Sequence, residues 1–133
     1  MNTNKSRYGA LKRLLCTVVM VCLVLLTPAT SNAKTLNKRD GVNYFGIQKE
    51  TYYNLDMSRI YERADGDFGS HHKRWIRADG CKMYGPYIIC AADWRIHPYG
   101  SNVESSLGTC VVLDTGGFAS GDPTFQIDIA TNW

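Results

Sequence analysis

Residues 93–133 read DWRIHPYGSNVESSLGTCVVLDTGGFASGDPTFQIDIATNW, and three aspartates in this stretch lie beside predicted strands and glycine turns. Asp114 follows the apolar run 110–113 and precedes the turn Thr115-Gly116-Gly117. A short apolar run that ends in glycines is typical of a buried strand entering a tight turn. The stretch therefore predicts β-structure with carboxylates at strand ends.

The third aspartate, Asp128, lies inside the alternating segment FQIDIA, residues 125–130, which predicts a strand. A carboxylate within a half-apolar strand is costly unless it is hydrogen-bonded or protonated. Two simpler interpretations stay open at this point. Asp114 can cap its turn by accepting backbone N–H groups, and Asp128 can face solvent.

The spacing of this stretch resembles the three-aspartate (3D) domain, a bacterial cell-wall module. In that motif an aspartate is followed by a proline five residues on, then by a glycine and a small hydroxyl residue, and here these are Asp93, Pro98, Gly100 and Ser101. The family then has Asp-Thr-Gly-Gly and a final apolar strand that holds the third aspartate. Residues 114–117 and 127–129 match these two parts.

The chain also departs from the family pattern. His97 replaces the usual apolar residue before the proline, and fourteen residues separate Asp114 from Asp128 where about eleven are usual. The loop 119–123, ASGDP, replaces a lysine-glycine turn. These departures affect the expected substrate contacts more than the expected fold.

The resemblance implies a mostly β fold, a small double-psi β-barrel, similar to membrane-bound lytic murein transglycosylase A and rare lipoprotein A. It implies cleavage of peptidoglycan glycan strands by one carboxyl group. That group protonates the leaving glycosidic oxygen and then takes a proton from the muramic acid 6-hydroxyl, which closes an anhydro ring. Asp128 matches the acid, Asp114 would raise the pKa of Asp128, and Asp93 would complete the acidic cluster.

Four residues are expected to contact the substrate: Trp94, Tyr99, Gly116 and Gly117. An alternative is a non-catalytic barrel that binds peptidoglycan or a partner, as in expansin-like and barwin-like proteins. Trp94, Tyr99 and Trp133 would then stack on sugar faces, although core packing is the simpler role for each aromatic ring.

The first 33 residues predict a secretory signal peptide. Four Lys and Arg precede the apolar run 14–26, and the small residues Ser31 and Ala33 suit cleavage before Lys34. The run is shorter than the about 20 residues of a spanning helix, so an uncleaved anchor is the weaker alternative. We expect a secreted, wall-associated monomer without stable membrane association after cleavage.

Removal of the signal peptide reverses the sign of the charge. The remaining hundred residues carry eleven Lys and Arg and twelve Asp and Glu, a net charge of −1. No nucleic-acid partner is therefore expected. One small domain fits this length, with an extended segment at 34–50 and the barrel domain at 51–133.

One helix is predicted, at residues 55–64, because Met57, Ile60, Tyr61 and Ala64 follow the helical period. Asn54 or Asp56 would cap its start and Asp65-Gly66 would end it.

Residues 81–90 predict a β-hairpin with Gly85-Pro86 at its tip, so that Tyr84 pairs with Tyr87. Cys81 then faces Cys90, and export permits a disulfide between them, which leaves Cys110 free.

No metal or cofactor is expected. His71 and His72 are adjacent in a polar loop, and no spacing typical of metal ligands accompanies them. Cys110 with His97 would suit a thiol peptidase, but Cys110 begins a strand and not a helix, which disfavours that chemistry.

Overall fold

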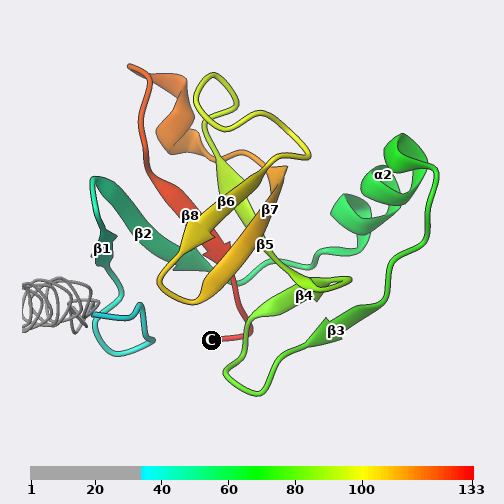
Figure 1. Ribbon diagram of the computed structural model, residues 1–133, viewed down its shortest axis with the longest axis horizontal. Helices are drawn as coiled ribbons and strands as arrows, with labels where there is room; N and C mark the ends of the chain where they lie inside the picture. Colours follow the sequence, from blue (N-terminus) through cyan, green and yellow to red (C-terminus); the bar gives the residue numbers. More distant parts are fainter. Residues whose placement is uncertain (1–33) are drawn as a thin grey trace, which may run out of the picture. The chain divides into compact units, whose positions relative to one another are not determined.

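The computed structural model describes residues 34–133, and the expected signal peptide, residues 1–33, lies outside them. The described part is a mixed sheet with one α-helix, which confirms the mostly β prediction (Figure 1). The elements are β1 Asn43–Phe45, β2 Gln48–Tyr53, α2 Ser58–Phe68, β3 Arg74–Ile76, β4 Lys82–Tyr84, β5 Tyr87–Ala92, β6 Asn102–Ser105, β7 Gly108–Asp114, the 3-10 helix η1 Gly117–Ser120 and β8 Ile127–Ala130.

Strand β5 is the centre of the sheet, as Figure 1 shows. It pairs in parallel with β7 on one edge, and on the other edge it pairs antiparallel first with β4 and then with β8. Strand β8 continues the sheet through a parallel pair with β2, and β1 ends that side. Because β5 is covered on both faces, its sequence YIICAA is a continuous apolar run and not an alternating one.

The two faces of the sheet belong to two separate cores. One core contains the alternate β5 residues Ile88, Cys90 and Ala92, together with apolar residues of β7 and β8. The other contains Ile89 and is covered by the apolar stripe of α2, which includes Ile60. In Figure 1, α2 lies at one side of the sheet, and β2 and β8 lie away from it. The part of the second face that α2 leaves uncovered is where polar residues of β2, β8 and β7 lie.

The helix is longer than predicted and is shifted towards the C-terminus. It begins at Ser58, where the Asp56 carboxylate accepts hydrogen bonds from the backbone N–H and the hydroxyl of Ser58 at 3.0 and 2.7 Å. The helix continues through Asp65, because this buried carboxylate accepts the Tyr84 hydroxyl at 2.8 Å instead of interrupting the helix. It ends at Gly69, whose φ of +63° is the left-handed conformation that glycine allows.

The predicted hairpin is present, but the predicted cysteine pair is wrong in this structure. Tyr84 pairs with Tyr87, as expected. The pairing of β4 with β5 covers only Met83 and Tyr84, because β8 pairs with the rest of β5 in place of β4. Cys90 therefore pairs with Ile129, and Cys81 bridges to Thr131. All three described cysteines are free and buried in one core.

The N-terminal segment belongs to the same packed unit, so the expected boundary at residue 50 falls inside β2. Leu36 is buried in the core next to Cys81, although its neighbours in the chain are polar and basic. Its backbone N–H donates to the Ser106 hydroxyl at 3.0 Å. The segment is thus packed in place and is not a spacer.

A buried carboxylate, Glu50 of β2, draws two distant parts of the sheet together. It has no exposed surface, and it accepts hydrogen bonds from Asn43 at 2.8 Å and from the backbone N–H and hydroxyl of Ser106 at 2.8 and 2.5 Å. Strands β2 and β6 are four steps apart in the sheet order, which is about 19 Å in a flat sheet at about 4.8 Å per strand. A direct bond between Glu50 and the turn after β6 therefore requires the sheet to curl strongly.

Replacing Glu50 by glutamine should destabilise the domain by about 2 to 4 kcal/mol. Glutamine keeps the shape of the glutamate side chain, but its amide NH2 group would face donors that need an acceptor. The measurement is urea unfolding of residues 34–133, which contain both cores. Glu104→Gln is the matched control, because this exposed carboxylate accepts one bond, from Thr109, and its loss should cost under about 0.5 kcal/mol. Equal effects of the two changes would contradict the role given to Glu50.

The thiols of Cys81, Cys90 and Cys110 should be unreactive in the folded protein. Burial raises the pKa of the Cys81 thiol to about 12, and the contact with Cys110 together with burial raises the pKa of Cys90. A chromogenic disulfide reagent should detect none of them before unfolding and all three afterwards, without added reductant. Detection of one thiol after unfolding would instead show that two of them are bonded.

Candidate functional site

The uncovered part of the second sheet face carries two of the predicted aspartates in one row across four strands. Thr51 of β2 is paired with Asp128 of β8, Asp128 with Ala91 of β5, and Ala91 with Asp114 of β7. Side chains of directly paired residues point to the same face of a sheet. Asp128 and Asp114 therefore lie on either side of Ala91, whose methyl group is too small to separate them.

Strand ends and one irregularity produce this alignment. The pairing of β5 with β7 shifts by one residue between Cys90 and Ala91, so Ala91 meets Asp114 and not Leu113. Leu113 stays in the core beneath α2. Without that shift, the apolar Leu113 would take the place of the carboxylate beside Ala91.

Hydrogen bonds orient both carboxylates. The Thr51 hydroxyl donates to Asp128 Oδ1 at 2.8 Å, and the Tyr53 hydroxyl donates to Asp114 Oδ2 at 3.2 Å. The Gln126 amide in turn donates to the Thr51 hydroxyl at 3.3 Å. Asp128 and Asp114 are both half-buried, so each is oriented by the protein and still reached by solvent.

The two aspartates have different electrostatic settings. Burial raises the pKa of Asp128, the negative charge of Asp114 raises it further, and the Thr51 hydrogen bond and Lys49 partly oppose the shift. Burial and the adjacent Asp114 also raise the pKa of the Tyr53 hydroxyl, which therefore stays a hydrogen-bond donor. A carboxyl group whose pKa is raised by its surroundings is suited to deliver a proton.

Asp93 is not part of the pair. Its buried carboxylate forms two hydrogen bonds with the Arg95 guanidinium at 2.8 and 2.7 Å, which hold its pKa well below the usual range. It also accepts the Thr124 backbone N–H at 3.1 Å, while Arg95 donates to the carbonyls of Ala119 and Gly121. The expected third member of the acidic cluster thus holds the loop between η1 and β8 in place.

Aromatic side chains flank the Asp114 end of the row. The Trp94 indole N–H donates to the Asp114 backbone carbonyl at 3.0 Å, and its ring lies 5.4 Å from the Tyr99 ring. Phe68, at the end of α2, stacks on the other side of Tyr99 at 5.5 Å. Trp94 and Phe68 are exposed, so this aromatic row is open to a ligand.

The two predicted glycine positions differ from each other. A Cβ atom at Gly116 would meet the Phe118 ring at 2.5 Å, so Gly116 is needed for packing of η1. No atom lies within 4 Å of a Cβ built at Gly117. Gly116 is therefore a structural position, and Gly117 leaves open space next to the turn after Asp114.

The sequence interpretation missed Thr51 and Tyr53. Their strand, QKETYY, lacks apolar alternation because Glu50 faces inward, where a hydrophobic residue is usual. Strand β2 pairs in parallel with β8, and the paired residues are 77 positions apart in the sequence. This pairing brings Thr51 to Asp128. No local pattern in the sequence signals that pairing.

The arrangement of Cys110 and His97 does not support the thiol peptidase chemistry that the sequence already disfavoured. Cys110 is fully buried, and its thiol contacts the Ser105 hydroxyl at 3.4 Å. His97 instead lies against Phe125, with ring centroids 6.4 Å apart. Within residues 34–133, no group of three or more His, Cys, Asp or Glu is placed to hold a metal ion. In the same part of the chain, no helix is long and apolar enough to cross a bilayer.

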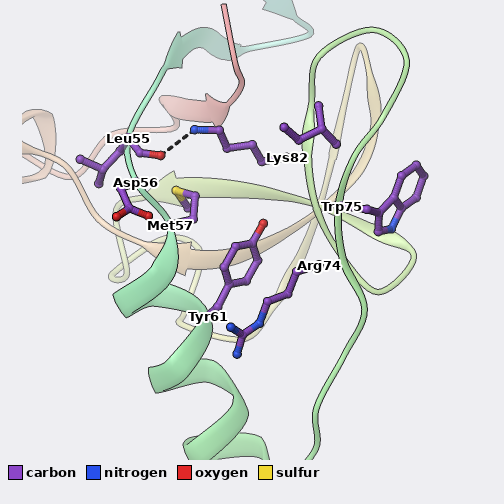
Figure 2. Close-up of a pocket in the computed structure, with 8 residues that line it drawn as sticks. Leu55, Asp56, Met57, Tyr61, Arg74, Trp75 and Lys82 are labelled. Carbon is purple, nitrogen blue, oxygen red and sulfur yellow. Dashed lines mark hydrogen bonds between the residues drawn. The ribbon is translucent and has the colours of Figure 1, made fainter.

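A separate hollow of about 300 Å³ lies between the start of α2 and β3 (Figure 2). Tyr61, Met57 and Trp75 line it, and the Lys82 ammonium group donates to the Leu55 carbonyl at 2.6 Å across its upper end. None of the paired or aromatic residues of the aspartate row lines this hollow. The pairing of two half-buried carboxyl groups, together with the raised pKa of Asp128, and not the depth of the surface, identifies the row as the candidate site.

Comparison of the chain with protein-family models, with curated proteins and with solved structures gives no match.

The pKa of Asp128 should respond in opposite directions to changes in its two neighbours. Asp114→Asn removes a negative charge and should lower the pKa of Asp128, whereas Thr51→Val removes a hydrogen bond to the ionised form and should raise it. Carboxyl ¹³C NMR titration of residues 34–133 measures both shifts. Because the folded-state pKa of Asp128 is raised, its share of stability is present below the unfolded pKa and is lost as the pH rises through the folded pKa. Asp128→Asn should therefore melt no lower than the parent at pH 7, and shifts of the same sign in the first two variants would contradict the row geometry.

Proposed function

We propose that this domain cleaves peptidoglycan glycan strands as a lytic transglycosylase, with Asp128 as the general acid and base. The observation that carries the proposal is the pair of half-buried aspartates across Ala91, in which burial and Asp114 raise the pKa of Asp128. A carboxyl group with a raised pKa suits proton delivery to a glycosidic oxygen.

The proposed reaction needs one proton donor and consumes no water. Asp128 gives its proton to the glycosidic oxygen as the bond from that oxygen to the anomeric carbon breaks. The muramic acid 6-hydroxyl then attacks the same carbon, and its proton passes to the Asp128 carboxylate. The products are a shortened glycan and a 1,6-anhydro sugar, and Asp128 is protonated again for the next cycle.

The remaining residues have supporting roles in this proposal. Asp114 adds to the rise in the pKa of Asp128 that burial produces, and it is itself oriented by the Tyr53 hydroxyl. Asp93 acts at a distance, because its ion pair with Arg95 fixes the loop that leads into β8. Trp94 offers an exposed aromatic ring to a sugar next to Asp114, and Tyr99, which packs between Phe68, Trp94 and the Arg63 guanidinium, supports it.

The proposal includes a double-psi β-barrel fold, and the topology gives it support. Two parallel pairs, β2 with β8 and β5 with β7, are joined through the antiparallel pair of β5 and β8. Curling of the sheet around Glu50 brings β2 against the turn after β6. Closing a sheet protects its edges, which favours a hundred-residue domain outside the cell. Signal-peptide export to the cell wall and a monomeric state complete the proposal.

A second candidate function is peptidoglycan binding without cleavage. The exposed aromatic row formed by Phe68, Tyr99 and Trp94 favours it, because stacked rings at the surface bind sugars without any proton transfer. In that case the aspartates would accept hydrogen bonds from sugar hydroxyls.

Asp128→Asn should abolish glycan cleavage while the fold persists. The amide keeps the bond from Thr51 but cannot transfer a proton, and loss of a positioned general acid costs about 10² to 10⁴ in rate. Asp114→Asn should retain activity and move the basic limb of the pH–rate profile to lower pH, because the pKa of Asp128 falls. The measurement is the release of 1,6-anhydromuropeptides from intact peptidoglycan, followed by mass spectrometry.

Asp122→Asn is the matched control, since this exposed aspartate lies in the loop near the site and is not in the row. Its activity should equal that of the parent. If the parent releases no anhydro product and still sediments with peptidoglycan, the domain is a binding module and the catalytic proposal fails.

A further inference from the structure

The β1–β2 hairpin presents a concentrated group of exposed apolar side chains. Of the ten exposed large hydrophobic residues in the described chain, four lie within residues 42–47: Val42, Tyr44, Phe45 and Ile47. Ile47 is 79% exposed and Tyr44 is 66% exposed. Nothing in the aspartate row uses them, and an exposed apolar group of this kind marks an interaction site.

The hairpin carries these side chains all round its tip. Phe45 pairs with Gln48, so only Gly46 and Ile47 form the loop, and the φ of +63° at Gly46 fits the first position of a tight hairpin turn. Tyr44 and Phe45 are consecutive strand residues and point to opposite faces of the hairpin, while Ile47 lies at the tip. In Figure 1 this hairpin lies on the side of the sheet remote from α2 and β3.

This arrangement decides the kind of partner. A flat protein surface can cover one face of a hairpin, and it would leave either Tyr44 or Phe45 in water. A lipid headgroup layer surrounds an inserted tip and takes apolar side chains from both faces at once. Tyrosine and phenylalanine are also side chains that favour the boundary between headgroups and acyl chains.

Charge along the chain favours an anionic surface. Residues 34–49 contain four Lys and Arg and one Asp, a net charge of +3, whereas residues 50–133 contain seven Lys and Arg and eleven Asp and Glu, a net charge of −4. The one acid of the first group, Asp40, is already paired with Lys34 and Arg39 at 3.5 and 3.4 Å. Lys49 stands directly opposite Tyr44 in the hairpin. Lys34, Lys38 and Arg39 lie at the base of the hairpin, where the Lys38 carbonyl accepts the Tyr52 hydroxyl, so Lys49 is the cation of this group that lies next to the apolar tip.

We propose that the β1–β2 hairpin docks this domain reversibly on an anionic lipid bilayer, with Ile47, Phe45 and Tyr44 entering the headgroup region and Lys49 contacting a lipid phosphate. Such docking is peripheral and needs no spanning helix. It replaces the expectation of a domain without membrane association, and it is independent of glycan cleavage. Because Lys49 and Thr51 lie on the same face of β2, docking would also place the aspartate row close to the membrane surface.

The test is co-flotation of residues 34–133 with vesicles of equimolar phosphatidylglycerol and phosphatidylcholine, compared with vesicles of phosphatidylcholine alone. The domain should float with the anionic vesicles, and Ile47→Ser should weaken the apparent affinity about five- to tenfold. Lys49→Gln should weaken binding by a smaller factor that disappears at high salt. Ile47 is an exposed turn residue, so thermal melting should show an unchanged fold.

Ile76→Ser is the matched control, because Ile76 is a 53% exposed isoleucine in β3, away from the hairpin. It should bind vesicles as the parent does. The proposal is overturned if the parent does not float with anionic vesicles, or if the Ile47 and Ile76 variants lose affinity equally. It is also overturned if soluble polyphosphate displaces the parent and the Ile47 variant equally well, since that result would show attraction by charge alone.

Discussion

The Glu50 carboxylate is the contact on which the arrangement of this domain depends. Three donors converge on it from β1 and from the turn after β6, and it has no exposed surface. A buried charge is tolerated only when such donors replace its water, so these segments are held to one geometry. Strand β2 is fixed by this network at its middle, and the next residue in the strand is Thr51. The candidate site is therefore built directly on the most constrained part of the sheet.

The two ends of the aspartate row are stabilised in different ways. Asp128 lies beside β2, whose position depends on Glu50, while Asp114 ends β7 and is paired with Ala91 of β5. The three aspartates of the motif thus divide into two that face each other and one that supports the loop between them. An aspartate can therefore be part of a sequence motif because it forms a structural ion pair, and not only because it transfers a proton.

Local features of the chain were predictable from the sequence, and long-range ones were not. The Gly85-Pro86 turn and the apolar stripe of α2 are set by neighbours in the chain, so the hairpin and the one helix were found. The Cys81–Cys90 pair failed because β8, forty residues further on, replaces β4 beside β5. The bond from Thr51 to Asp128 and the inward position of Glu50 were missed for the same reason, since both depend on strands that meet only in the folded sheet.

The row of Thr51, Asp128, Ala91 and Asp114 has a consequence for how the protein folds. Its members come from four strands, and its two parallel pairs, β2 with β8 and β5 with β7, join segments far apart in the chain. Such contacts form late, because long loops must close before the pairing compensates for the lost entropy. A partly folded chain can contain the helix and the β4–β5 hairpin, but it cannot contain the carboxyl pair. Any chemistry of this row consequently requires a molecule in which all four strands have paired.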